Sequence, residues 1–71
     1  MNIQYDVKTN LLYIRIDDRK QDLINRRNSD NIVLDIGADN KIVGIEILEA
    51  SRNVNLEKLL PVHYEPARIA G

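Results

Sequence analysis

The sequence predicts an α+β domain: a small antiparallel β-meander sheet of four to five strands with one short C-terminal helix packed on it. Three observations lead to this fold class. Stretches in which apolar and polar residues alternate recur before Ala50, as is typical of half-buried strands. The segments between them are rich in Asn, Asp and Gly, which favour turns. Leucines at helical spacing appear only afterwards, from Leu56 onward.

The first two strands are expected to form a hairpin. Ile3 and Tyr5 alternate with polar neighbours, and the polar run 6–10 follows them as the loop. Residues 11–17 give the clearest strand signal, because β-branched and aromatic residues are frequent there. One face of this second strand is aliphatic and should point into the core: Leu12, Ile14 and Ile16.

The polar stretch 18–30 is expected to contain a short edge strand near residues 22–27. Leu23 and Ile24 are its only adjacent apolar pair. Arg26 and Arg27 suit an edge, because charge discourages pairing with the strand of a second molecule.

The best hairpin signal joins residues 31–36 to residues 41–49 through the loop 37–40. A four-residue loop predicts the pairs Ile36–Lys41, Leu34–Val43 and Ile32–Ile45. A shift by one residue would set Leu34 against Gly44 and bury less apolar surface. The residues predicted to be most buried are Leu12, Ile14, Ile32, Leu34, Val43, Ile45 and Ile47.

After these strands, Asn53 or Asn55 can cap a short helix that Pro61 ends. Its apolar stripe should lie on the sheet: Leu56, Leu59 and Leu60. We expect residues 1–61 to form one domain and residues 62–71 to form an extended tail.

The composition restricts the possible partners. The chain has 71 residues, of which 10 are basic and 11 acidic, so its net charge of −1 gives no field that would favour nucleic acid or an anionic membrane. It has no cysteine, and His63 is its only histidine, so we predict no disulfide, metal or other cofactor. A domain this small usually needs a disulfide, a bound metal or a partner subunit to be stable. We therefore expect a cytoplasmic protein, without membrane contact, that forms a homodimer.

The second face of the predicted sheet is mixed rather than polar, and we take it as the candidate interaction face. Its members are Tyr13, Arg15, Val33, Ile42, Gly44, Glu46 and Leu48. A glycine inside a strand often marks the close approach of another segment, so a Cβ at Gly44 should collide with a neighbour or with a second subunit.

Other readings of the polar residues remain open. Glu46 could join Asp35 and Asn31 to bind a cation or a basic partner, or the three could be ordinary residues of a solvated sheet face. Tyr13 beside Arg15 could recognise a carboxylate or a base, or simply pack across strands.

Basic residues also gather between positions 15 and 27, which could form a weak phosphate patch, but interleaved acids favour a solvated face. A lone His63 without a partner nucleophile does not indicate proton transfer. We assign no catalytic residue.

Several stretches resemble the YuzE-like family of short bacterial and archaeal proteins. They are Tyr5-Asp6, Asn10, Leu12-Tyr13-Ile14-Arg15-Ile16, Asn31-Ile32-Val33-Leu34-Asp35 and Ile42 to Ser51. The block Val-Gly-Ile-Glu-Ile-Leu-x-Ala-Ser, which begins at Val43, is the most specific part. The family usually has Asp in place of Asn10 and an Asp-Gly type of turn in place of residues 37–40.

This resemblance implies a small α+β fold and no assigned activity. Some relatives lie beside genes for small toxin-like proteins, which suggests an accessory or antitoxin-like role. Our hypothesis is a non-catalytic protein-interaction module that partners another small protein. The alternative is a small ligand- or nucleic-acid-binding domain that uses Tyr13, Arg15 and the basic stretch.

Overall fold

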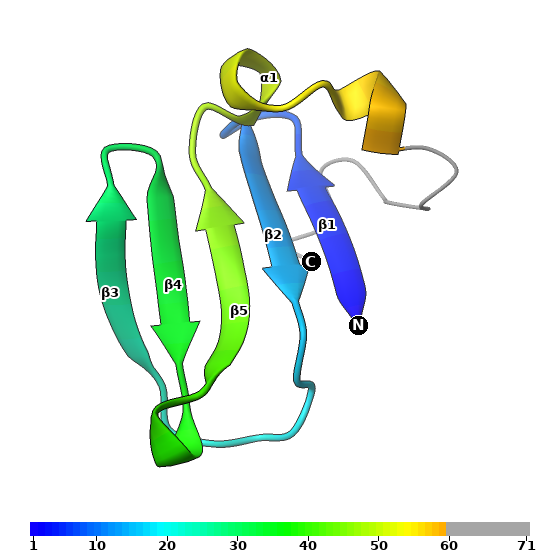
Figure 1. Ribbon diagram of the computed structural model, residues 1–71. Coiled ribbons are helices and arrows are strands. Elements are labelled where there is room, and N and C mark those ends of the chain that lie inside the picture. Colours follow the sequence, from blue (N-terminus) through cyan, green and yellow to red (C-terminus); the bar gives the residue numbers. More distant parts are fainter. Residues whose placement is uncertain (60–71) are drawn as a thin grey trace.

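Five antiparallel strands form one sheet in a computed structural model, which describes residues 1–59 of the chain (Figure 1). The strands are β1 (Asn2–Asp6), β2 (Leu11–Arg15), β3 (Ile24–Ser29), β4 (Ile32–Ile36) and β5 (Ile42–Ile47). The helical elements are the 3₁₀ turn η1 (Ala38–Asn40), the short helix α1 (Ala50–Asn53) and the 3₁₀ turn η2 (Leu56–Leu59). The predicted α+β class and antiparallel sheet are confirmed.

The order of strands across the sheet is β1-β2-β5-β4-β3. Strands β3, β4 and β5 follow one another as in a meander, but β5 then lies beside β2 and completes the sheet. β1 and β3 are therefore the two edge strands, and the predicted edge strand is found as β3. The connection from β2 to β3 passes along one end of the sheet, next to η1 (Figure 1).

The predicted pairing of the β4–β5 hairpin is wrong by two residues. Leu34 lies opposite Ile45 and Ile32 opposite Ile47, and the register shifts between Asp35 and Ile36. The connection is wider than a four-residue loop because η1 fills it, with Asp39 and Asn40 at positive φ, and because the bulge adds a residue. A displacement of two residues keeps every side chain on its face, so the predicted faces hold along the regular ladder.

The core lies at the end of the sheet where β1 and β2 meet α1. Tyr5, Leu12 and Ala50 are buried there, and the side chains that pack against them are Ile3, Ile47, Val54, Leu56 and Leu59. The predicted contact of Leu56 and Leu59 with the sheet is thus confirmed. Leu60, Pro61 and the predicted tail 62–71 lie outside the described residues.

The prediction of the most buried residues is only partly right. Leu12 and Val43 are 0% and 2% exposed. Five others are only half-buried: Ile14, Ile32, Leu34, Ile45 and Ile47. Among residues 1–59, α1 and η2 pack on one end of this face and leave the rest uncovered. We call the aliphatic face the set Ile3, Tyr5, Leu12, Ile14, Ile32, Leu34, Ile45 and Ile47.

The helical part also differs from prediction. A helical turn forms earlier, at α1, because Glu49 adopts the left-handed conformation and turns the chain out of the sheet. The side chain of Asn53 donates to the carbonyl oxygens of Leu48 and Glu49, so it closes this turn instead of capping the start of the next one.

Candidate functional site

The side of the sheet opposite the aliphatic face carries a hydrogen-bonded polar network centred on Asp35. This carboxylate is only 4% exposed. Tyr13 Oη donates a 2.9 Å bond to Asp35 Oδ2, and Asn25 Nδ2 donates a 2.5 Å bond to Asp35 Oδ1. Side chains from β2, β4 and β3 thus meet on one carboxylate, which satisfies the requirement that a buried charge be hydrogen-bonded.

Gly44 makes this network possible. It lies in β5, opposite both Arg15 of β2 and Asp35 of β4. A Cβ on Gly44 would lie 2.8 Å from Tyr13 Oη, which is too close, and 3.1 Å from Asp35 Oδ2, which is tighter than most such contacts. The predicted close approach at this glycine is therefore confirmed, and the approaching atoms belong to the same chain.

Arg15 extends the network toward the loop between β2 and β3. Its Nη1 donates a 3.1 Å bond to Tyr13 Oη, its Nε donates a 2.6 Å bond to the carbonyl oxygen of Asp17, and its Nη2 contacts that of Arg19 at 3.4 Å. Burial raises the pKa of Tyr13, and the Arg15 hydrogen bond partly opposes this rise. The guanidinium of Arg15 thus donates hydrogen bonds to Tyr13 and to the backbone of the loop.

Glu46 is the second carboxylate on this face. It lies opposite Tyr13 and Val33, with Asn25 Nδ2 at 3.5 Å from its Oε2. Its pKa is raised above the usual glutamate value, first because burial disfavours the charged form and then because Asp35 lies beside it. Val33, rather than Asn31, is the residue of β4 opposite Glu46, and the backbone carbonyl of Asn31 accepts a bond from the N–H of Leu48.

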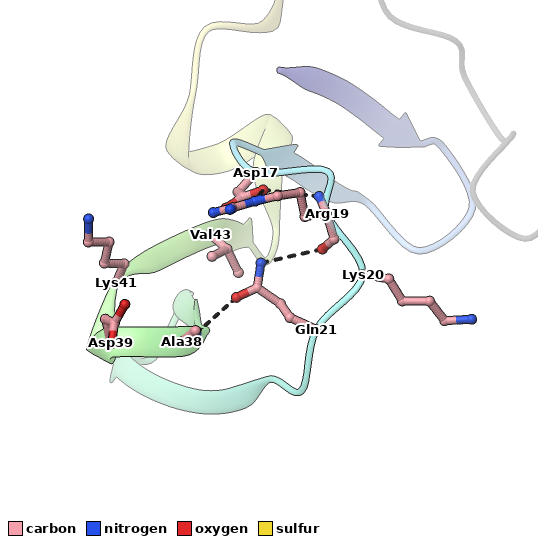
Figure 2. Close-up of a pocket in the computed structure, with 8 residues that line it drawn as sticks. All are labelled: Asp17, Arg19, Lys20, Gln21, Ala38, Asp39, Lys41 and Val43. Atoms are coloured by element: carbon pink, nitrogen blue, oxygen red, sulfur yellow. Dashed lines mark hydrogen bonds and ion pairs between the residues drawn. The ribbon is translucent and has the colours of Figure 1, made fainter.

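A second polar region surrounds a pocket of about 360 Å³ between the β2–β3 loop and η1 (Figure 2). It is lined by Asp17, Arg19, Lys20, Gln21, Ala38, Asp39, Lys41 and Val43. In Figure 2 the side chains of Lys20 and Lys41 extend from opposite sides of the pocket and point away from each other. Their ammonium groups therefore do not converge on one anion.

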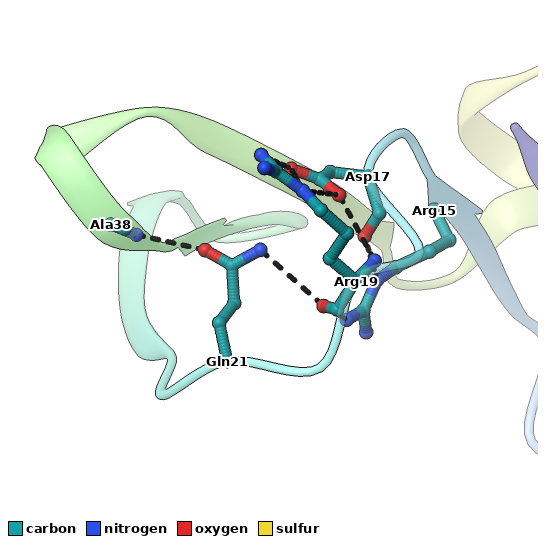
Figure 3. Close-up of polar contacts among 5 residues, drawn as sticks. All are labelled: Arg15, Asp17, Arg19, Gln21 and Ala38. Atoms are coloured by element: carbon teal, nitrogen blue, oxygen red, sulfur yellow. Dashed lines mark hydrogen bonds and ion pairs between the residues drawn. The ribbon is translucent and has the colours of Figure 1, made fainter.

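The other polar groups of this pocket hold the loop together (Figure 3). Arg19 forks onto the carboxylate of Asp17, with Nη2 2.7 Å from Oδ2 and Nε 3.1 Å from Oδ1. This guanidinium and the Arg19 backbone N–H, which also binds Asp17 Oδ1, hold the pKa of Asp17 well below its usual range.

Gln21 fastens the same loop to the β4–β5 connection. Its Oε1 accepts a 2.9 Å bond from the backbone N–H of Ala38, while its Nε2 contacts the carbonyl oxygen of Arg19 at 3.4 Å. Its side-chain oxygen occupies the space that a Cβ on Gly37 would need. Gly37, like Gly44, leaves room for a side chain from a segment earlier in the chain.

Asn10 joins the first hairpin to α1. It has a φ of 58°, and its Oδ1 accepts bonds from Tyr5 Oη at 2.7 Å and from the backbone N–H of Ser51 at 3.0 Å. Its Nδ2 donates to Ser51 Oγ, and its carbonyl oxygen accepts from the Ala50 N–H. Asn10 therefore connects the first hairpin to Ser51, where the segments that resemble the family end.

The structure brings Tyr13, Arg15, Gly44 and Glu46 of the predicted interaction face into one region, with Val33 half-buried beside them. Ile42, 46% exposed, lies at the bulged end of β5, and Leu48 follows the strand in a turn. Arg26 pairs with Leu34, so it lies on the other side of the sheet.

Asn25 is a member of the network that no sequence pattern indicated. Its position depends on how β3 pairs with β4, which no local pattern fixes. Asp35 was considered for the outer face, but its deep burial was not foreseen. His63 lies outside the described residues.

In residues 1–59 no group of three or more acidic side chains is arranged to hold a metal ion. Nor does any helix in this part of the chain have the length and apolar character required to cross a membrane.

A family model described as a protein of unknown function, DUF2283, matches residues 2–51. The chain belongs to the DUF2283 family. The match covers the whole sheet and the start of α1, and it ends at Ser51, the partner of Asn10. The expected membership of an uncharacterised small-protein family is thus confirmed.

One curated relative of this DUF2283 chain is a protein of Methanosarcina mazei named "Putative hypoxanthine phosphoribosyltransferase". The two are 52% identical over 42 residues, which cover 56% of this chain and 34% of the relative. The chain therefore spans about a third of that protein's length. No solved structure matches it.

Proposed function

We propose that this DUF2283 chain is a non-catalytic protein-interaction module of the cytoplasm, and that its aliphatic face forms the contact surface of a homodimer. The observation that carries the proposal is that α1 and η2, the elements within residues 1–59 that pack on that face, cover only one end of it. Ile14, Leu34 and Ile45 lie side by side across three neighbouring strands, and all three are half-buried. Contact with a second copy would remove this apolar surface from water, which stabilises by about 25 cal/mol per Å².

The charges on this side of the sheet favour a second copy as the occupant. By register and alternation, the charged side chain among the strand residues of this side is Arg26, in the edge strand β3. A two-fold symmetric contact sets one patch against itself, so it tolerates an uncharged patch and excludes a strongly charged one. The net charge of −1 adds little long-range repulsion between two copies.

The size of the chain supports the same conclusion. A chain of 71 residues without cysteine has few other means of adding stability.

We propose no catalytic role, because the polar atoms of the candidate residues are hydrogen-bonded to other groups of the same chain. Tyr13 and Arg15 bind Asp35 and the backbone of the β2–β3 loop. The accessory role suggested by the family resemblance fits a module that acts through contact surfaces.

Two adjacent residues of β4 provide a matched test. Leu34 lies on the aliphatic face and Val33 on the opposite one, and both are half-buried. Sedimentation velocity over a range of concentrations should show a dimer of the wild-type protein, about tenfold or more weaker self-association of Leu34→Thr, and no change for Val33→Thr. A wild-type protein that stays monomeric at high micromolar concentration would rule out the dimer. Equal weakening by both variants would rule out this face as the contact.

A further inference from the structure

We propose that the open edge of β3 is a docking site for an extended acidic segment of another protein, which would add to the sheet as a further strand. The site is the sheet edge rather than the aliphatic face, so this inference goes beyond the proposed dimer and does not depend on it.

The edge is structurally ready for strand addition. β3 pairs with β4 on one side, and among residues 1–59 no element lies along its other side (Figure 1). All six residues from Ile24 to Ser29 are exposed. Such an edge presents a row of backbone N–H and C=O groups that an extended segment can pair with.

The side chains of β3 select the charge of the incoming strand. The strand contains Arg26 and Arg27 and no acidic residue. The two arginines alternate across the sheet, because Arg26 pairs with Leu34 and Arg27 with Val33. Like charges directly opposite each other destabilise a ladder, whereas opposite charges stabilise it.

A second β3 strand is therefore a poor occupant of this edge. Two copies aligned antiparallel about the centre of the strand would place Arg26 of one copy opposite Arg27 of the other. An acidic segment instead gains an attractive pair on each side of the sheet.

The preference can be written as a short pattern. Ile24 is 67% exposed and favours an aliphatic residue opposite it, while Asn25 favours a polar one. For an antiparallel partner, the residues facing Arg27, Arg26, Asn25 and Ile24 read in chain order as acidic, acidic, polar and aliphatic. The chain itself has one pair of consecutive acids, Asp17-Asp18, and a basic residue follows it rather than this pattern.

The test uses isotope-labelled full-length protein and a blocked peptide, Thr-Glu-Glu-Thr-Val-Thr, followed by NMR. We expect saturable shifts confined to the backbone amides of β3 and β4. The same peptide with lysines in place of the glutamates should bind about tenfold or more weakly. A version methylated on alternate backbone nitrogens should not bind, because it cannot complete the ladder.

Two variants of equal charge change complete the test. Arg26→Glu should abolish the preference between the acidic and basic peptides, because with either peptide one repulsive pair then offsets the attractive one. Lys20→Glu, in the exposed loop before β3, should leave the preference unchanged. Absence of binding at millimolar peptide, equal binding of the methylated peptide, or an equal effect of both variants would each overturn the proposal. Sedimentation measures dimerisation separately. A failure of the proposed dimer can therefore be distinguished from a failure of peptide binding at β3.

Discussion

Tyr13 in β2 donates its hydroxyl proton to Asp35 in β4, although β5 lies between these two strands. The 2.9 Å bond passes over Gly44, the residue of β5 that has no side chain to block it. β2 and β4, which share no backbone ladder, are thereby linked directly through their side chains. Each member of this arrangement constrains the other two.

Gly44→Ala should destabilise the protein by about 1 to 3 kcal/mol, because the new methyl group would displace Tyr13 Oη from the buried Asp35 carboxylate. Tyr13→Phe removes the same bond without adding a methyl group and should cost a similar amount. Urea denaturation of both single variants and of the double variant measures the coupling. The double variant should cost clearly less than the sum, since both changes break one interaction. Strict additivity would show that Gly44→Ala does not act through the bond between Tyr13 and Asp35.

Leu12→Ala should cost about 2 to 5 kcal/mol, since Leu12 is 0% exposed in the core. Ile45→Ala should cost less in the monomer, because Ile45 is half-buried on the aliphatic face. Thermal melts at low and high protein concentration separate the two positions. The loss of stability caused by Ile45→Ala should increase with protein concentration, because more of the wild-type protein is then dimeric. The loss caused by Leu12→Ala should stay constant. Equal behaviour of the two variants would contradict both the core assignment and the proposed interface.

Glu46→Gln should flatten the pH dependence of stability in the range just above the ordinary glutamate pKa. The pKa of Glu46 is raised in the folded protein by burial and by Asp35, so the folded state binds its proton more tightly than the unfolded state does. The stability that this provides is complete below the ordinary glutamate pKa and is lost as the pH rises through the raised value. Asp17, whose pKa is lowered, has the opposite sign, but its contribution changes below this range.

Melting temperatures of the wild-type protein and Glu46→Gln across that range measure the effect. The wild type should lose stability as the pH rises, and the variant should not, because its amide stays neutral and can donate to Asp35. Parallel curves for the two proteins would show that Glu46 titrates normally.

Asn10→Ala should destabilise the protein by about 2 kcal/mol or more, since it breaks the bonds to Tyr5 and Ser51 and places alanine, which adopts the left-handed conformation less readily than asparagine, at positive φ. Asn10→Asp should be close to wild type. The oxygen that accepts from Tyr5 and Ser51 is retained, and the Ser51 hydroxyl can donate where it accepted before. Chemical denaturation of the two variants distinguishes the cases, and a large loss in Asn10→Asp would show that the amide donor is essential.

The fold class followed from the sequence because alternation and turn residues are local signals. They placed strands at Ile3 and Tyr5, at Leu12 and Ile14, and on both sides of the η1 connection. They also identified β3 as an edge. The pairing of Leu34 with Ile45 could not be derived in the same way, because the bulge beside Ile36 has no local signature.

The candidate site was predicted less completely for a related reason. Gly44 and Tyr13 stood out as residues, but the bond from Tyr13 to Asp35 depends on β5 lying between their strands. That order is a property of the whole sheet. Gln21 and Asn10 likewise gain their partners Ala38 and Ser51 only after distant segments have come together.

The central place of β5 sets the order in which this chain can assemble during synthesis. β1 with β2, and β3 with β4, are complete hairpins as soon as their own residues have left the ribosome. The two hairpins share no backbone ladder, so β5 must emerge and pair with β2 and β4 to join them into one sheet. Up to that moment the nascent chain displays the strand edges of β2 and β4 that β5 later covers. Premature release of the chain before Ile47 would therefore yield two unjoined hairpins with aliphatic edges, the kind of species that chaperones retain and proteases remove.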